Sequence, residues 1–367
     1  MIYLKYYLMH KNDIVAVTED IEVKEVRVSS LMPSRLKVGS ILNYWLEARM
    51  IDMHRANSRM LFRALRLRQS DEIERIIDIS HAVTITDNWW LRREDEELDY
   101  YNLKRYNESI ANIALTGVSD KSFSEKLAKW YLELGTTGSF EKAWKFIDGQ
   151  WCMYKKGNTE ELISEFFCYC FLHYLNEPVA EYKIMRVAST GIRNKANIFI
   201  LSKDFTDNAS VDFEPFWNLF WGETDEKFIL QNIPERLCIP YLKIIYFDAL
   251  LQNPDRHSQN IGFLRNAETG ELIKLAPNFD FNMALIAKSD LDFNKQRGSI
   301  LANDFLDALE YSNISPKLIL RSMPDIKTAI DLAIRDTKIS FKEYDIDFDL
   351  ISNYVLSCAK YIENRVS

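Results

Sequence analysis

The apolar positions of residues 1–120 predict a small region that mixes strands and helices. Alternating apolar and polar residues indicate short strands at 1–9 and 13–17. Apolar residues then recur every three or four positions, as in helices with one buried face. The helices that this spacing predicts are 39–49, 56–67 and 72–79. A loop follows, and we interpret its adjacent Trp89 and Trp90 as packing residues rather than as a base-stacking surface.

Residues 121–205 are predicted to be rich in strands. Two alternating segments, 140–147 and 150–155, flank Asp148-Gly149, which is a strong signal for a type I′ hairpin. Asn158 followed three residues later by Glu161 predicts a capped helix start. That helix runs to about residue 175 and is apolar on most faces, which predicts burial. The further strands predicted in this part are 181–187 and 197–201.

Residues 206–367 are predicted to be mainly helical. The helix at 234–251 is apolar all round, which places it in a core. Segments 261–264 and 273–276 then form a predicted hairpin around Asn266 and Gly270. The later helices predicted are 301–311, 315–321, 326–335 and 347–364. The pattern therefore predicts an α+β chain in three parts: 1–120, 121–205 and 206–367.

Composition and charge narrow the class of protein. The chain has 367 residues, of which 47% are hydrophobic and 27% charged, as in ordinary globular proteins. The net charge of -8 argues against a general nucleic-acid binder, although a local basic face over residues 49–68 stays open. The five cysteines are odd in number and lack a CxxC pair, so we expect buried free thiols. Without a predicted leader or membrane helix, we expect a cytoplasmic protein.

The run from Asn253 to Asn260 carries the strongest candidate chemistry. Pro254 cannot continue the preceding helix, so Asp255 is placed on a stiff loop beside a buried element. The hairpin that follows would return Asp280 to Asn260, because residues flanking paired strands lie together. Phosphoryl transfer needs one carboxylate that orients a hydroxyl, and magnesium takes oxygen ligands such as an amide and a carboxylate. The alternative is a capped polar surface turn.

Two neighbours of Asp255 are interpreted as supports of this loop. His257 lacks a second histidine at ligand spacing, so it is expected to brace the loop rather than bind a metal. Arg256 is expected to pair with a nearby carboxylate.

A second constellation could bind the phosphates of a nucleotide. Gly135, Gly138 and Ser139 belong to a turn of small residues just before the predicted hairpin. Lys155 ends the second strand of that hairpin, and we prefer it to Lys156 as the phosphate-binding lysine. A lysine at an apolar strand end needs a carboxylate partner. Glu165 in the following helix is the candidate, with Glu161 behind it. The alternative is a pair of solvated lysines.

With these residues in view, positions 121–360 resemble the HipA-like kinases, which share elements with phosphatidylinositol kinases and protein kinases. Asp255-Arg256-His257 with Asn260 is similar to their catalytic loop, and Asn278-Phe279-Asp280 to their second metal-binding segment. The resemblance implies a two-lobed kinase-like fold, with a strand-rich N-lobe at 121–205 and a helical C-lobe at 206–367. Residues 1–120 resemble an accessory region ahead of such domains.

The resemblance also implies roles for individual residues. Asp255 would be the catalytic base, Asn260 and Asp280 the Mg²⁺ ligands, and Lys155 the lysine that binds the ATP phosphates. Segment 200–205, which includes Ser202 and Lys203, would be the hinge against adenine.

Three features depart from the protein-kinase pattern. Asn253-Pro254 stand where protein kinases have His-Arg. Asn282 stands where they have glycine, and asparagine tolerates a left-handed backbone better than most residues do. The glycine loop is short. In some HipA-like kinases a serine of this loop is autophosphorylated, so Ser139, Thr136 or Thr137 is a candidate for modification.

Three functions follow from these residues. The first is an ATP- and Mg²⁺-dependent kinase for protein serine or threonine, with an inhibitory protein partner as a further expectation. The second is a kinase for a small molecule or lipid headgroup. The third is a nucleotide-binding pseudokinase that acts as a regulatory or toxin–antitoxin-like binding protein. The acidic net charge argues against direct nucleic-acid binding in each case.

Overall fold

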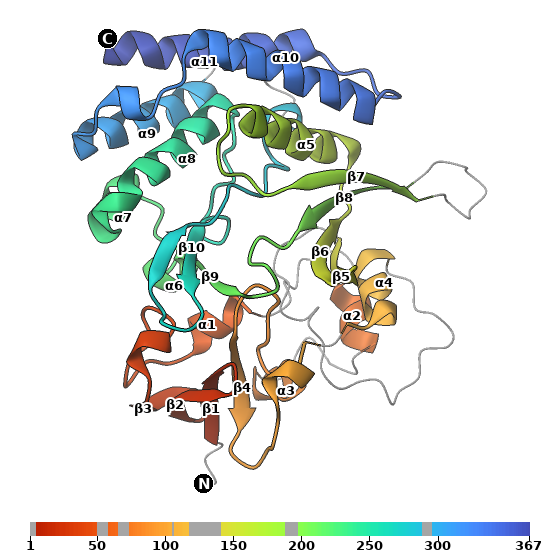
Figure 1. Cartoon of the computed structure of the whole chain (residues 1–367), viewed down its shortest axis with the longest axis vertical. Helices are drawn as coiled ribbons and strands as arrows, with labels where there is room; N and C mark the ends of the chain where they lie inside the picture. The colour runs from red at the N-terminus through yellow and green to blue at the C-terminus, as the bar shows by residue number, and fades with distance from the viewer. Residues whose placement is uncertain are drawn as a thin grey trace. The chain divides into compact units, whose positions relative to one another are not determined.

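The computed structural model describes residues 5–49, 58–64, 73–104, 106–116, 141–187, 197–287 and 296–367. Strands and helices are both abundant, which confirms the α+β class (Figure 1). The chain groups into two compact units. Unit 1 comprises Met1–Lys156, Leu201–Trp221 and Phe263–Ile273, and unit 2 comprises Gly157–Ile200, Gly222–Gly262 and Lys274–Ser367. The three contiguous parts and the two kinase lobes stay predictions.

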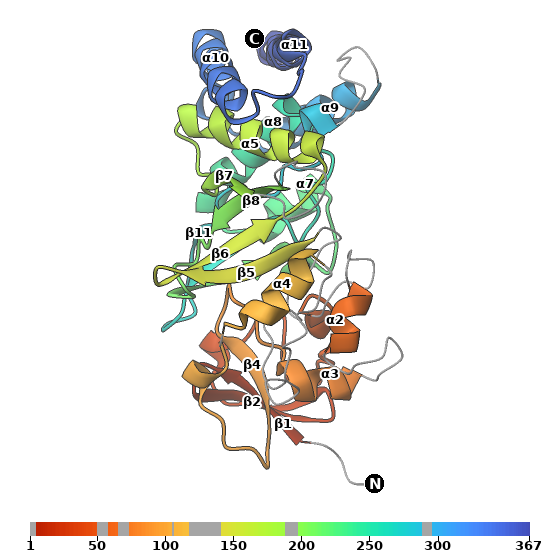
Figure 2. The same cartoon turned by 90° about the vertical axis from the view of Figure 1, so that its right-hand side faces the viewer.

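An antiparallel sheet opens unit 1, with strand order β3-β2-β1-β4, and Figure 2 labels three of these strands, β1, β2 and β4. Its strands are β1 (Lys5–His10), β2 (Asp13–Glu19), β3 (Glu22–Val26) and β4 (Trp89–Arg93). Trp89 and Trp90 are fully buried in the cores beside this sheet, which confirms their packing role. The helices of this part are α1 (Asn43–Glu47), α2 (Ser58–Ala64), α3 (Ile73–Ser80) and α4 (Glu108–Thr116).

Helix α1 is shorter than the helix predicted at 39–49, and that prediction was wrong at its start. Gly39 has a φ of +84°, outside the helical region. The amide groups of Gly39 and Leu42 donate to the carbonyls of Val23 and Ile21 at 2.8 Å. Residues 39–42 therefore pair with the β3 segment and cannot form a helical turn.

The predicted hairpin is confirmed as β5 (Lys142–Ile147) and β6 (Gln150–Lys155), which pair without a register shift. Asp148 and Gly149 have φ angles of +49° and +80°, as a type I′ turn requires. The Asn208 side chain closes the turn: its amide donates to the Gly149 carbonyl and its oxygen accepts from the Trp151 amide, both at 3.0 Å.

A short sheet with order β11-β10-β9 was only half predicted. The hairpin β10 (Gly262–Asn266) and β11 (Leu272–Leu275) is confirmed, but β9 (Val211–Pro215) and α6 (Phe216–Phe220) were missed. The acidic residues of β9 are buried rather than solvated. Asp212 accepts from His10 at 2.7 Å, and Glu214 accepts from Arg265 at 2.8 Å. These pairs satisfy charges that the local sequence leaves without a partner.

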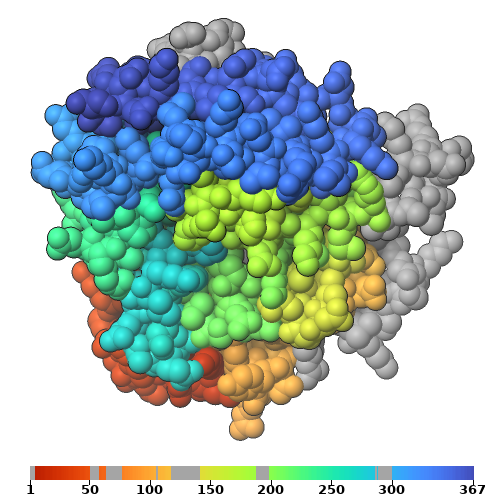
Figure 3. All heavy atoms as spheres, turned by 45° about the horizontal axis from the view of Figure 1, so that its top comes forward, coloured from red at the N-terminus to blue at the C-terminus, as the bar shows by residue number. Residues whose placement is uncertain are grey.

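Unit 2 is built around buried helices. The capping box of α5 (Thr159–Tyr174) is confirmed, with Asn158 and Glu161 each accepting from the other's backbone at 2.9 Å. Its remaining elements are β7 (Tyr182–Val187), β8 (Asn197–Lys203, which continues into unit 1), α7 (Glu226–Asn232), α8 (Cys238–Leu250), α9 (Gln296–Ser312), α10 (Met323–Ser340) and α11 (Phe348–Val366). Helix α10 packs along α5 (Figures 1 and 3). Aromatic contacts of Phe171 with Phe167 and Phe247 join α5 to α8.

Two predicted helices of this unit are corrected. Segment 315–321 forms only a 3-10 turn at Pro316–Leu318, because Ser322 caps a new helix, α10, soon afterwards. The helix predicted at 234–251 begins as a 3-10 turn, Glu235–Leu237, before α8.

Two expectations about surface and thiols can be compared with the described residues. The cysteines are free, and all but the half-buried Cys238 are buried, as expected. Arg49 does not belong to a basic face, because it is buried and its guanidinium holds Asp87 at 2.7 Å.

No helix in the described part of the chain is both long and apolar enough to cross a membrane.

Candidate active site

The candidate catalytic loop is anchored to the end of α8. After Leu251 the backbone turns sharply at Gln252, whose φ is +45°. The Asn253 amide then donates to the Asp248 carbonyl at 2.9 Å, and its side chain donates to the Asp248 carboxylate at 2.8 Å. Pro254 follows on the surface, so the chain leaves the helix in one defined direction.

Arg256 joins the two segments that the sequence singled out. Its guanidinium binds both oxygens of the buried Asp248 carboxylate, at 2.8 and 2.9 Å. Its Nη1 donates to the Asn260 and Phe279 carbonyls, both at 2.8 Å, and the group lies 5.0 Å from the centre of the Phe281 ring. The supporting role expected for Arg256 is confirmed.

Electrostatics keep this guanidinium charged. Burial opposes its charge, but Asp248 and then Asp280 outweigh that effect and raise the pKa of Arg256 above its usual value. One charged side chain therefore fixes the loop that carries Asp255 against the segment that carries Asp280.

Asp255 and Asn260 lie at the two ends of one loop and are hydrogen-bonded to each other. The Asp255 carbonyl accepts from the His257 amide at 2.9 Å and from the Asn260 side-chain nitrogen at 3.1 Å. This bond uses the nitrogen of the Asn260 amide, which leaves its oxygen as the end that can bind a cation. His257 is exposed, and its Nδ1 accepts from the Gln259 amide at 3.2 Å. The loop is thus braced by its own backbone.

Asp280 is held in an unusual backbone conformation. Its φ is +62°, in the left-handed region that residues other than glycine rarely adopt. Asn282, a residue type that tolerates this conformation, does not adopt it. The Asp280 amide donates to the Tyr182 hydroxyl at 3.2 Å, and that hydroxyl is hydrogen-bonded to Glu165.

The environment of Tyr182 keeps its hydroxyl protonated. Burial and then the charge of Glu165 raise the pKa of Tyr182 well above its usual value. The hydroxyl therefore stays a donor to Glu165 and an acceptor for the Asp280 amide. Through this tyrosine, the buried Glu165 of α5 is coupled to the position of Asp280.

A second link ties the segment after Asp280 to α5. The Ser164 hydroxyl donates to the Ala284 carbonyl at 2.8 Å and accepts from the Ala287 amide at 2.7 Å. The Leu285 amide donates to the Leu251 carbonyl at 3.1 Å. The segment is therefore bonded both to α5 and to the start of the catalytic loop.

The donor set of Asn260 and Asp280 fits magnesium. An amide oxygen and a carboxylate are hard ligands, and magnesium takes few ligands from protein. The described residues hold no group of three or more histidine, cysteine, aspartate or glutamate side chains that could hold a metal ion.

The remaining candidates belong to unit 1. Lys155 ends β6 and is 8% exposed, whereas Lys156 is more exposed and pairs with Glu141 at 2.7 Å. Ser202 and Lys203 end β8, where the next residue, Asp204, donates its amide to the Trp151 carbonyl at 3.0 Å. Gly135, Gly138 and Ser139, with Thr136 and Thr137, lie outside the described residues.

Two residues of this site were missed by sequence reasoning. Asp248 could have been found, because a lone acidic residue on a helix that is apolar all round needs a buried partner. Tyr182 could not, because an aromatic residue in an amphipathic strand has many uses and nothing local links it to residues 165 or 280.

Comparisons with solved structures show which fold this chain has. The structure is similar to HipA of Shewanella oneidensis MR-1, solved in a complex with HipB and operator DNA, with a TM-score of 0.59 and 11% identity over 98% of this chain and 99% of that chain. It also matches the proinflammatory kinase CtkA of Helicobacter pylori, with a TM-score of 0.42 and 18% identity over 62% of this chain and 89% of that one. No family model and no curated protein matches the sequence.

The fold is therefore HipA-like, as the resemblance predicted. The similarity to HipA covers nearly the whole chain, so it extends beyond residues 121–360 into the N-terminal part.

Proposed function

We propose that this protein is a Mg²⁺- and ATP-dependent kinase that phosphorylates serine or threonine side chains of a protein. The observation that carries the proposal is the Arg256 guanidinium, which holds the Asp255–Asn260 loop and the Asp280 segment within hydrogen-bond reach of one group. A carboxylate, an amide and a second carboxylate are the residue types that phosphoryl transfer uses. The HipA-like fold supports this assignment as an analogy.

Each residue has a distinct role in this proposal. Asp255 accepts a hydrogen bond from the substrate hydroxyl and orients it toward the γ-phosphate. Asn260 and Asp280 hold Mg²⁺, which would neutralise charge on the phosphates when bound. The Tyr182 hydroxyl, which accepts from the Asp280 amide, would support the position of that residue.

The sequence also suggests nucleotide-binding roles for Lys155, Ser202 and Lys203. Lys155 would bind the phosphates, and the segment with Ser202 and Lys203 would contact adenine. The burial of Lys155 at a strand end favours it over the surface-paired Lys156 for this role.

We also propose a cytoplasmic location and an inhibitory protein partner. The HipA of S. oneidensis was solved with HipB and operator DNA, and this partner proposal rests on likeness of fold.

Phosphate transfer from γ-labelled ATP tests the proposed function. We expect label in the protein fraction when the chain is incubated with Mg²⁺ and candidate protein substrates, and no label when EDTA removes the metal. Label confined to small molecules or lipids would support the second candidate function. Mg²⁺-dependent ATP binding without transfer to any acceptor would contradict a kinase and support a pseudokinase.

Replacing Lys155 by alanine should lower kcat/KM for ATP by about 10- to 100-fold, because a hydrogen bond to a charged group contributes about 1.5–3 kcal/mol. Lys156→Ala is the matched control, since it removes the neighbouring lysine and only a surface ion pair. Steady-state kinetics with varied ATP measure both. Equal losses in the two variants, or a larger loss for Lys156→Ala, would contradict the role of Lys155.

A further inference from the structure

The loop between β3 and α1 is held by a buried ion pair of unit 1. The Arg265 and Glu214 side chains are 6% and 0% exposed, and the Arg265 Nη1 lies 2.8 Å from a Glu214 oxygen. The Arg265 guanidinium also donates to the Ser30 and Met32 carbonyls at 2.9 Å. The Glu214 carboxylate accepts from the Ser34 amide and hydroxyl, both at 2.6 Å. Hydrogen bonds to charged groups are strong, so residues 30–34 are fixed in one conformation.

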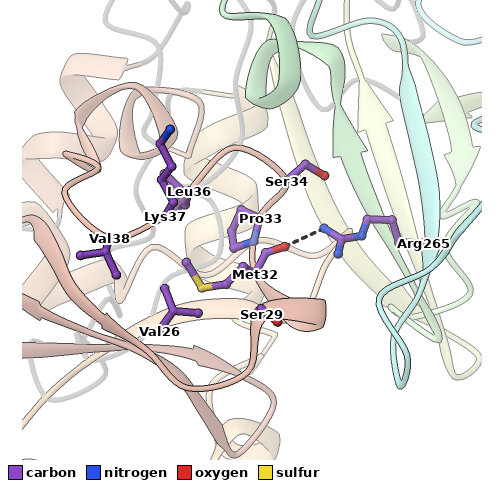
Figure 4. Close-up of a pocket in the computed structure, with 9 residues that line it drawn as sticks. All are labelled: Val26, Ser29, Met32, Pro33, Ser34, Leu36, Lys37, Val38 and Arg265. Carbon is purple, nitrogen blue, oxygen red and sulfur yellow. Dashed lines mark hydrogen bonds between the residues drawn. The ribbon is translucent and has the colours of Figure 1, made fainter. Parts of the chain in front are cut away.

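A pocket lies beside the fixed part of this loop (Figure 4). Its volume is about 600 Å³, within the range of small-molecule sites. Five of the nine residues that line it are apolar: Val26, Met32, Pro33, Leu36 and Val38. Met32 and Pro33 are buried and belong to the segment that Arg265 and Glu214 hold. A pocket whose wall is already ordered costs little conformational entropy to fill.

The four polar residues of the lining differ in what their side chains already bind. Arg265 and Ser34 are engaged by Glu214. Ser29 and Lys37 are exposed, and neither side chain forms a hydrogen bond or an ion pair within the described residues. Lys37 is therefore the charged group that the lining offers to a ligand.

The Lys37 ammonium and the apolar wall would contact different ends of a ligand. In Figure 4 the Lys37 side chain extends away from Val26 and Met32. A ligand that packs its apolar part on those two residues would therefore meet the ammonium with its other end. Such a ligand has an apolar body and a polar end that accepts hydrogen bonds.

The acidic residues next to the lining in sequence have cations of their own. In β3, Glu22 pairs with Lys24 at 2.7 Å and Glu25 pairs with Arg27 at 3.0 Å. None of the nine lining residues is acidic. The charge that the pocket presents to a ligand is therefore positive, and it comes from Lys37.

We propose that this pocket binds a small carboxylic acid with an apolar tail. The tail would pack on Val26, Met32 and Leu36, and the carboxylate would pair with Lys37. An anion without a tail fits less well, because apolar side chains form most of the wall. An amine fits less well, because it would meet Lys37 with a like charge. This binding requires neither ATP nor Mg²⁺, so it does not depend on the proposed kinase activity.

Isothermal titration calorimetry of the full-length chain with hexanoate, octanoate and decanoate tests this proposal. We expect saturable binding, and affinity should rise by up to about fourfold for each methylene group that the pocket covers. Octanol has the same tail as octanoate without the charge, so it should bind more weakly by about threefold or more. Octylamine should bind more weakly still.

Two substitutions separate the contribution of the carboxylate from that of the tail. Lys37→Glu should weaken octanoate binding by about threefold or more and remove the advantage of octanoate over octanol. Val38→Asp places a charge in the apolar wall and should weaken octanoate and octanol alike, by about fivefold or more. Both residues are exposed, Val38 by 61%, so both variants should fold.

Matched substitutions elsewhere on the chain serve as controls. Lys342→Glu reverses an exposed charge, and Ile339→Asp changes an exposed apolar residue of α10. Both should bind octanoate as the unaltered chain does. No saturable binding of the three acids, equal or tighter binding of octanol, or equal losses in the controls would overturn the proposal. So would binding that Lys37→Glu and Val38→Asp leave unchanged, because the acid would then occupy another site.

Discussion

Replacing Asp255 by alanine should reduce phosphate transfer by about 10²- to 10⁴-fold, the usual contribution of a positioned general base. The loss should fall on kcat, because Asp255 is proposed to act on the substrate hydroxyl and not on ATP. The variant should still bind Mg²⁺ and ATP, because Asp255 is not among the residues proposed to hold them. Single-turnover transfer from labelled ATP and a separate nucleotide-binding measurement check the two parts.

Two hydrogen bonds that brace the catalytic loop do not depend on the Asp255 carboxylate. The hydrogen bonds from His257 and Asn260 go to the backbone carbonyl of Asp255, and alanine retains that carbonyl. Asp331→Ala is the matched control, since it removes an exposed carboxylate from α10. Full transfer activity in a folded Asp255→Ala protein would exclude Asp255 as the base, whereas equal losses in both variants would point to a general effect.

Replacing Arg256 by alanine should lower the free energy of unfolding by about 3–5 kcal/mol, the cost of removing one partner of a buried ion pair. The change leaves the Asp248 carboxylate without its guanidinium and releases the Asn260 and Phe279 carbonyls. Denaturant titration followed by circular dichroism measures the loss. Transfer activity should fall as well, because the two segments of the site lose their common donor.

A double-mutant cycle separates this ion pair from a general packing loss. The variant that lacks both Asp248 and Arg256 should be less destabilised than the sum of the two single changes, because no lone charge is left buried. Arg335→Ala removes an arginine whose carboxylate contact, with Asp336, is at the surface, and its denaturation midpoint should stay nearly unchanged. Simple additivity in the cycle would mean that the two side chains do not act as a pair.

Local sequence signals were sufficient where the fold depends on neighbours in the chain. The Asp148-Gly149 hairpin and the Asn158–Glu161 capping box are both confirmed, because each rests on backbone angles and bonds within a few residues. The helix leading to the catalytic loop was predicted for a similar reason, since an all-round apolar helix must be buried. The spacing of Asp255 and Asn260 was enough to identify the candidate loop.

Contacts between distant residues escaped local reasoning. Strand β9 was missed because Asp212 and Glu214 suggest a solvent-exposed segment. Their partners, His10 and Arg265, are distant in the sequence and cannot be identified from it. The helix predicted at 39–49 failed at its start because Gly39 and Leu42 donate their amides to the β3 segment. In both cases the pattern of apolar positions along the chain was compatible with more than one local structure, and contacts with distant residues decided between them.

The sequence by itself therefore determined which side chains could act as the base, the metal ligands and the phosphate-binding lysine. It also determined which local turns carry them. The tertiary structure decided how part of that chemistry is assembled. It supplied Asp248 as the partner of Arg256, Tyr182 as the support of Asp280, and Arg265 as the partner of Glu214. The physical reason is range: turns and caps form within a few residues, whereas buried charges and shared donors need partners that folding brings from elsewhere.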